Sequence, residues 1–310
     1  MSPILVTCYV NADLDGYAGV VAYAEFLEKN GQNALAGVIG QPHDEVKYVL
    51  TRFGLAGAEI ITDDQSFNEV ILVDASDLNG LEGKIEAAKV KEIIDHRQVN
   101  EADKFPNAKT QIELVGAAAT LIAEKFKQAD IPISKRSALL IYSAIISNTL
   151  NFKGSVTTER DKKMAAWLRQ FIEVSDDYWR ELFSAKSDLS GEKLASRIKR
   201  NFAWVVLGGE RIGISQLEII GAAELVRDRG EEIIVALNKI KTDLNLDFVF
   251  QNIIELELGK NYLVADDDKI KAILAKVLGL KFNGIVAQRD KLIMRKQIIP
   301  LIKEELENKS

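Results

Sequence analysis

The chain has 310 residues, which is enough for two domains of ordinary size with separate cores. Hydrophobic residues make up 47% of it, and the formal net charge of −6 argues against general binding to nucleic-acid phosphates. The sequence has no apolar run of membrane-spanning length and no signal-type pattern at its start. We therefore expect a cytoplasmic protein without nucleic-acid or membrane partners.

Cysteine and histidine are scarce in this sequence. The single cysteine, Cys8, excludes an internal disulfide and is typical of a reducing compartment. The two histidines are His43 and His96. Any metal site must therefore rely mainly on carboxylates.

The first part of the chain alternates short apolar runs with helix-like stretches. Strands are predicted at residues 4–10, 33–40, 59–61, 70–73 and 92–94, with amphipathic helices at 16–30 and 44–53 between them. This alternation predicts an α/β domain built on a parallel sheet covered by helices.

The rest of the chain predicts helices and then a second, smaller α/β domain. Residues 115–183 have apolar residues at helical spacing, and the polar stretch 184–193 marks the best domain boundary. After it we expect a hairpin turning at Gly208 and Gly209, strands at 232–236 and 246–252, and a helix at 267–279. The predicted domains are 1–186 and 194–310, joined by a linker at 187–193.

Acidic residues follow three of the predicted strands. These residues are Asp13 and Asp15 after the first strand, Asp74 and Asp77 after the fourth, and Asp95 with His96 after the fifth. Parallel strands end at one edge of a sheet, so all of these side chains except Asp77 should converge in one cleft. For Asp77 the sequence favours a cap or turn role. Divalent cations are the simplest compensation for so many carboxylates, and this ligand set favours Mn²⁺ or Mg²⁺. For Asp13 and Asp15 taken alone, helix capping is an equally good interpretation.

Together these motifs resemble the DHH superfamily of phosphoesterases, and most closely the manganese-dependent (family II) inorganic pyrophosphatases. That family joins a DHH domain to a C-terminal DHHA2 domain. The resemblance rests on six stretches in order: VNADLDG, VDASD, IIDHRQ, SAIISNTLNFKGSVTTERD, AKSDLSG and MRKQIIP. It covers nearly the whole chain.

The resemblance implies a site with two metal ions between the two domains. It gives Asp13 to one ion, Asp15 and His96 to the other, and Asp74 to both, with Asn148 as a further ligand. The ion would be Mn²⁺, with Co²⁺ or Mg²⁺ as alternatives. By analogy with the family, two chains could also pair through an edge of the first domain to form a homodimer.

The same resemblance assigns roles to other residues. Asp74, Asp95, His96 and Arg97 would form the catalytic group, with Asp95 orienting His96. Arg97, Arg295 and Lys296 would bind the substrate phosphates. The implied reaction is metal-dependent hydrolysis of phosphoanhydrides, with pyrophosphate or short polyphosphate as substrate.

The sequence departs from the family pattern inside the site. Tyr9 replaces the histidine of the first motif, and Arg97 replaces the second histidine of Asp-His-His, as in the prune-like branch of the superfamily. Asn148 replaces an aspartate, Ala203 a lysine and Met294 an arginine. Two alternatives to an enzyme therefore stay open: a catalytically impaired sensor of phosphate ligands, and a structural relative whose aspartates only cap helices.

Overall fold

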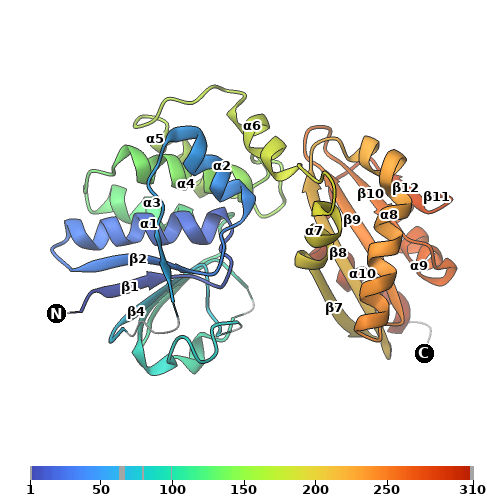
Figure 1. Cartoon of the computed structure of the whole chain (residues 1–310), viewed down its shortest axis with the longest axis horizontal. Helices are drawn as coiled ribbons and strands as arrows, with labels where there is room; N and C mark the ends of the chain where they lie inside the picture. The colour runs from blue at the N-terminus through green and yellow to red at the C-terminus, as the bar shows by residue number, and fades with distance from the viewer. Residues whose placement is uncertain (1, 63–66, 79, 99, 308–310) are drawn as a thin grey trace. The chain divides into compact units, whose positions relative to one another are not determined.

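The structure is a computed structural model that describes residues 2–62, 67–78, 80–98 and 100–307 (Figure 1). Its contacts divide the chain into two compact units, and the chain passes from the first to the second between Ala185 and Lys186. Each unit combines a six-stranded sheet with helices. The predicted α/β class with two domains is therefore confirmed. Within the described ranges, none of the helices has the length and apolar character needed to cross a bilayer.

The sheet of the first unit is entirely parallel, in the order β3-β2-β1-β4-β5-β6. Its strands are β1 (Ile4–Thr7), β2 (Ala34–Ile39), β3 (Glu59–Ile61), β4 (Val70–Val73), β5 (Val90–Asp95) and β6 (Lys109–Ile112). The first five strands begin and end within two residues of the predicted bounds, with one exception. Strand β1 ends at Thr7, whereas the prediction extended it to residue 10. The edge strand β6 was not predicted, because its sequence KTQI is too polar to be distinguished from a loop.

Helices α1 and α3 pack on one face of this sheet, and α4 packs against these two helices (Figure 1). The helices of the unit are α1 (Leu14–Lys29), α2 (Asp44–Phe53), α3 (Ala118–Gln128), α4 (Lys135–Asn148), α5 (Glu159–Leu168) and α6 (Tyr178–Lys186). They confirm the predicted helices at 16–30 and 44–53 and the helical character of 115–183. Helix α1 packs so closely on β4 that a Cβ atom on Gly19 would lie 2.5 Å from Val73 Cγ1.

The opposite face is covered by the part of the chain that connects β4 to β5 and β5 to β6. It contains two short 3₁₀ turns, η1 (Ala87–Lys89) and η2 (Ala102–Lys104). Leu81, Ile85 and Phe105 from this segment pack with Leu5 and Leu72 of the sheet. This packing buries the central strands on both faces, as their continuous apolar sequences require.

The strand order reverses between β1 and β4, which are neighbours in the sheet. One crossover leads from β1 toward β2 and the other from β4 toward β5, so the loops after β1 and β4 diverge at the carboxyl edge. Open parallel sheets bind ligands at this kind of position. The carboxylates that follow these strands are therefore brought to a point where a site can form.

The second unit has a mixed sheet in the order β11-β12-β10-β9-β8-β7. Its strands are β7 (Phe202–Leu207), β8 (Glu210–Ile219), β9 (Phe248–Glu255), β10 (Lys260–Val264), β11 (Phe282–Asn283) and β12 (Val286–Arg289). The hairpin β7–β8 turns at Gly208 and Gly209, both at positive φ, as predicted. Helices α7 (Lys193–Arg200) and α8 (Ala222–Asp243) pack on one face of the sheet, and α9 (Asp268–Leu278) and α10 (Arg295–Glu307) on the other.

The strand predicted at 232–236 is wrong, because these residues lie inside α8. The run of isoleucine and valine there is typical of a strand when read alone. However, Ile233, Leu237 and Ile240 are buried at helical spacing and pack against the sheet. Burial of this stripe outweighs the local preference of the β-branched residues.

Candidate metal centre

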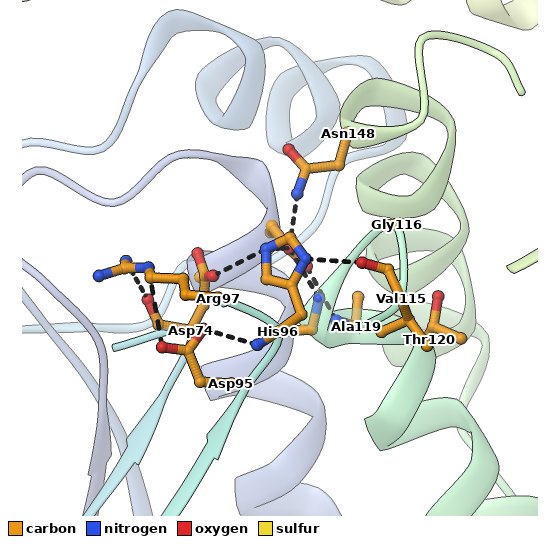
Figure 2. A network of polar contacts seen from close by, with 12 residues as sticks. Asp74, Asp95, His96, Arg97, Val115, Gly116, Ala119, Thr120 and Asn148 are labelled. Atoms are coloured by element: carbon orange, nitrogen blue, oxygen red, sulfur yellow. Dashed lines mark hydrogen bonds and ion pairs between the residues drawn. The ribbon is translucent and has the colours of Figure 1, made fainter. Parts of the chain in front are cut away.

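Asp15, Asp74 and His96 form a compact cluster in the first unit. Their ligand-type atoms all lie within 4.8 Å of one another. His96 Nε2 is 3.4 Å from Asp74 Oδ1 and 3.6 Å from Asp15 Oδ2. The predicted convergence of the three strand-end motifs therefore occurs, and the dashed lines in Figure 2 show how His96 and Asp74 face one another.

The imidazole of His96 is oriented by a main-chain carbonyl. Its Nδ1 lies 2.9 Å from the Val115 oxygen, and because that oxygen can only accept, Nδ1 carries a proton. The other nitrogen, Nε2, is the one that faces the two carboxylates. A metal-binding histidine is held in this way in proteins, with its second ring nitrogen donating to a carbonyl.

The Val115 carbonyl is itself positioned by a buried carboxylate. The N–H of the next residue, Gly116, donates to both oxygens of Asp161, at 3.0 and 2.9 Å. Asp161 belongs to the capping box of α5, in which it is paired with Thr158. A Cβ atom on Gly116 would lie 2.8 Å from Asp161 Oδ2, so this close approach requires glycine.

Asp15 is buried and its carboxylate accepts three hydrogen bonds. The N–H groups of Ala118 and Ala119, at the start of α3, each donate to one oxygen at 2.8 Å. Asn148 Nδ2 donates to Oδ2 at 2.7 Å. Asp15 thus also caps α3, a helix remote from it in sequence, and the partly positive helix N-terminus favours its charge.

We expect Asp15→Ala to destabilise the protein even when no metal is present. Losing this carboxylate leaves buried N–H donors without an acceptor, at a cost of about 1–3 kcal/mol for each such group. Urea unfolding in EDTA should show a loss of at least about 2 kcal/mol by this reasoning. Equal stability of Asp15→Ala and the natural protein in EDTA would contradict the capping role.

Asp74 lies at the end of β4 in a backbone conformation that is uncommon for residues other than glycine. Its φ is 55°, and its N–H donates to the Ile94 carbonyl at 2.8 Å. Burial raises the pKa of its carboxyl to about 6, although contact with His96 opposes the shift. Strain of this kind is often retained at functional sites, where it aims a side chain.

The same environment affects Asp15 and His96. Burial, with the charge of Asp74 added, raises the pKa of Asp15 well above its usual value. Burial acts to lower the pKa of His96, but its contact with Asp74 and the charge of Asp15 outweigh burial and raise this pKa to about 10. In the metal-free protein His96 is therefore a cation that compensates the carboxylates, and a metal ion would displace its proton.

Asp95 is fully buried and contacts the backbone of His96 and the side chain of Ser76. Its Oδ1 accepts from the His96 backbone N–H at 2.7 Å, and its Oδ2 accepts from Ser76 Oγ at 2.5 Å. The sequence suggested that Asp95 orients His96, but the ring itself is held by Val115. Asp95 therefore positions the residue rather than the imidazole.

Asp13 is the N-cap of α1. Its Oδ1 accepts from the N–H groups of Asp15 and Gly16 at 2.9 and 3.1 Å, which is the capping alternative open at the level of sequence. Tyr9 lies beside it, with its hydroxyl accepting from the Asp13 N–H at 3.2 Å. Burial and the charges of Asp13 and Asp74 raise the pKa of Tyr9 well above its usual value, so its phenol stays neutral.

Arg97 is held by the carbonyl of Asp74 and by an aromatic ring. Its Nη2 donates to the Asp74 main-chain oxygen at 2.6 Å, and its guanidinium carbon is 5.4 Å from the centre of the Tyr9 ring. Asp77 and Asp95 lie 3.4 and 3.7 Å from its nitrogens. Asp77, for which the sequence favoured a cap or turn role, is thus an ion-pair partner of Arg97.

Arg295 and Lys296 lie in the second unit, at the start of α10. Arg295 Nη1 donates to the carbonyls of Asn201 and Ile214, at 2.9 and 3.2 Å. These bonds fix the arginine on the sheet of its own unit. A contact of Arg295 or Lys296 with substrate stays a prediction.

Sequence reasoning missed Glu45 and the Val115 carbonyl. Glu45 is buried, and it accepts from the Leu14 N–H at 3.2 Å and from Ser147 Oγ at 2.6 Å. It thereby joins the starts of α1 and α2 to the end of α4, next to Asn148. Its place in an ordinary amphipathic helix gave no sign of this role. His43, which precedes α2, and Cys8, which is buried in the loop after β1, lie outside the cluster.

The donor set fits a divalent cation. Two buried carboxylates and an imidazole with its second nitrogen already engaged meet within ligand-forming distance. The amide of Asn148 points its nitrogen at Asp15, so only its oxygen remains as a donor to a metal. Asp15, Asp74 and His96 would therefore hold the ion, with Asn148 beside them.

Comparison with known proteins supports this interpretation. The DHH family, N-terminal domain, matches residues 3–145, and the DHHA2 domain matches residues 180–305. The chain is 27% identical to the manganese-dependent inorganic pyrophosphatase of Bacillus subtilis over 309 residues, covering 99% of both chains.

Solved structures show the same relationship. A Methanococcus jannaschii protein assigned to the family II inorganic pyrophosphatases aligns with a TM-score of 0.75 and 27% identity, covering 97% of this chain and 99% of that one. An exopolyphosphatase-related protein from Bacteroides fragilis shares the fold, with a TM-score of 0.52 and 15% identity, covering 99% of this chain and 92% of that one. The chain thus consists of a DHH family N-terminal domain followed by a DHHA2 domain.

Proposed function

We propose that this protein is a divalent-metal-dependent hydrolase of phosphoanhydrides, with pyrophosphate or short polyphosphate as its substrate. The observation that carries the proposal is the buried cluster of Asp15, Asp74 and His96, with His96 already oriented for metal binding. The named function of the Bacillus subtilis relative supports the same assignment. Mn²⁺ is the proposed ion, and Co²⁺ and Mg²⁺ are the alternatives.

A divalent ion at this site supplies Lewis-acid polarisation of phosphoryl oxygens. The residues of the chain prepare the surroundings. Val115 and Asp95 fix His96 through its ring and its backbone, and Asp74 is aimed by its strained backbone. Arg97 presents a guanidinium, one-third exposed, whose planar donors match phosphate oxygens. Arg97 would hold the substrate and offset the charge that develops on the leaving phosphate.

The two-metal arrangement between the domains and the substrate contacts of Arg295 and Lys296 remain predictions from the resemblance. So do pairing of two chains and cytoplasmic location. Geometry supports the ion position at Asp15, Asp74 and His96. The residues at the other ion position implied by the resemblance are Tyr9, Asp13 and Asp74.

One observation favours a second candidate, a protein that binds phosphate ligands without hydrolysing them. Asn148 donates a hydrogen bond to Asp15 from its amide nitrogen instead of adding a carboxylate to the cluster. A weaker metal site lowers the expected turnover. A protein with this defect could keep the phosphate-binding donors of Arg97 and act as a sensor.

Phosphate release separates the two candidates. The protein is stripped of metal, reloaded with Mn²⁺, Co²⁺ or Mg²⁺, and assayed on pyrophosphate, tripolyphosphate and a nucleotide panel. We expect metal-dependent release, highest on pyrophosphate or tripolyphosphate. Binding of pyrophosphate in calorimetry with no release from any substrate and any metal would overturn the hydrolase and support the sensor.

A further inference from the structure

The surroundings of Tyr9 differ sharply from those of His96, although both lie at the same edge of the sheet. Among the described residues, one group of three side chains has its metal-ligating atoms close enough together to share an ion. This group is Asp15, Asp74 and His96. Asp13 is outside this group. The second ion position implied by the family resemblance therefore has to be judged by what its residues do in this chain.

One carboxylate oxygen of Asp13 and the hydroxyl of Tyr9 are already engaged in holding the chain together. Asp13 Oδ1 accepts two N–H groups of the first turn of α1. The Tyr9 hydroxyl accepts from the Asp13 N–H. Tyr9 offers no imidazole nitrogen to a metal, and its hydroxyl oxygen already accepts the Asp13 N–H. Without an imidazole, this donor set fits a second divalent ion less well than Asp15, Asp74 and His96 fit the first.

A cation of the chain itself contacts Tyr9 and Asp74, two of the three residues of that position. The guanidinium of Arg97 stacks over Tyr9 at 5.4 Å and donates to the main-chain oxygen of Asp74 at 2.6 Å. Cation–π contact and the hydrogen bond fix it there, and Asp77 and Asp95 flank it with negative charge. A fixed positive charge beside Asp74 repels a second divalent ion that would share that carboxylate.

Tyr9 and Arg97 are thus a matched pair. Each replaces a histidine of the resembling family, and in space the two replacements contact one another. A histidine at position 9 would offer a ring nitrogen to a metal, whereas a tyrosine offers an aromatic face to a guanidinium. Together, the two replacements remove a histidine metal ligand and introduce an aromatic ring, Tyr9, with a bound cation, Arg97.

We propose that this protein holds one divalent ion, at Asp15, Asp74 and His96, and that the Arg97 guanidinium stacked on Tyr9 takes the place of the second. The inference rests on the proposed function for the existence of the first ion. A phosphate group of the substrate then binds the N–H donors of the Arg97 guanidinium instead of a second metal ion.

Metal stoichiometry tests the inference without any activity measurement. The stripped full-length protein is saturated with Mn²⁺, freed of excess metal, and analysed by elemental analysis and by electron paramagnetic resonance. We expect one Mn²⁺ per chain and the spectrum of an isolated ion. The double variant Tyr9→His/Arg97→His should bind two ions and show the spectrum of a magnetically interacting pair.

Two further variants serve as controls. Arg97→Lys keeps a positive charge at the site and should still bind one ion. Arg52→His adds a histidine on the surface helix α2, where Arg52 pairs with Glu181, and should also leave the count at one. Circular dichroism of each variant verifies folding.

The possible counts have distinct meanings. Two ions in the natural protein would overturn the one-ion inference and leave the proposed function intact. A folded double variant that still binds a single ion would overturn the assignment to Tyr9 and Arg97. No bound ion in the natural protein would contradict the proposed function itself.

Discussion

Replacing Asp74 by asparagine should abolish both metal binding and phosphate release. Asp74 is the carboxylate nearest to His96 Nε2, at 3.4 Å, and its strained backbone aims it into the cluster. Loss of an outer partner of a metal ligand costs roughly 10- to 100-fold in affinity or activity, and loss of a ligand itself should cost more. Calorimetric titration with Mn²⁺ and phosphate release from pyrophosphate measure the two effects.

The substitution is well suited to isolate the charge. Asparagine tolerates positive φ about as well as aspartate, so the backbone at position 74 should be retained. Asp130→Asn is the matched control, because Asp130 is also an aspartate at positive φ, 53°, but is exposed after α3. Full metal binding by the Asp74 variant would show that the cluster is not the metal centre.

Restoring a carboxylate at position 148 should lower the stability of the metal-free protein and raise its affinity for metal. Asn148 Nδ2 donates to Asp15 Oδ2 at 2.7 Å, and Asn148→Asp replaces this bond by two facing carboxylates. A hydrogen bond to a charged group contributes about 1.5–3 kcal/mol, so the variant should be less stable than the natural protein in EDTA by about this amount. With Mn²⁺ the added anionic ligand should raise metal affinity and increase the thermal shift on metal binding.

Thermal unfolding in EDTA measures the stability of the metal-free protein, and thermal unfolding with Mn²⁺ measures the shift on metal binding. Asn151→Asp is the matched control, since Asn151 follows closely in the turn after α4 but is not among the residues that contact Asp15. If Asn148→Asp were as stable as the natural protein in EDTA and gained no affinity for Mn²⁺, Asn148 would not be part of the metal centre.

The general position of the site could be predicted from the sequence for a simple geometric reason. Asp13, Asp74 and Asp95 each follow an apolar strand, and parallel strands end at one edge of a sheet. The periodicity of the sequence determines that the strands are parallel and covered by helices. No knowledge of side-chain direction is needed to bring these carboxylates to one place.

The different roles of the two first-motif aspartates could not be predicted in this way. Asp13 caps its own helix, whereas Asp15 turns toward α3 and binds the N–H groups of Ala118 and Ala119. That contact depends on how α3 packs on α1, which is a property of the tertiary structure. The Val115 carbonyl that orients His96 is a backbone group, so the amino-acid sequence does not indicate its role.

The relationship between Tyr9 and Arg97 was hidden for the same reason. In the sequence they are two separate departures from a family pattern, of which Tyr9 suggests a weakened metal site and Arg97 a phosphate-binding cation. In the structure they form one contact, which gives the departures a common physical meaning. The incorrect strand at 232–236 shows the converse error, since a local preference was read without the burial pattern of the whole helix.

The most direct test of the metal centre is anomalous diffraction from crystals grown with Mn²⁺, measured at the manganese absorption edge. We expect an anomalous peak bounded by Asp15, Asp74 and His96 Nε2, at metal–ligand distances of about 2.0–2.3 Å for such donors. Absence of a peak at these residues in Mn²⁺-saturated crystals, or a peak elsewhere on the chain alone, would contradict the account.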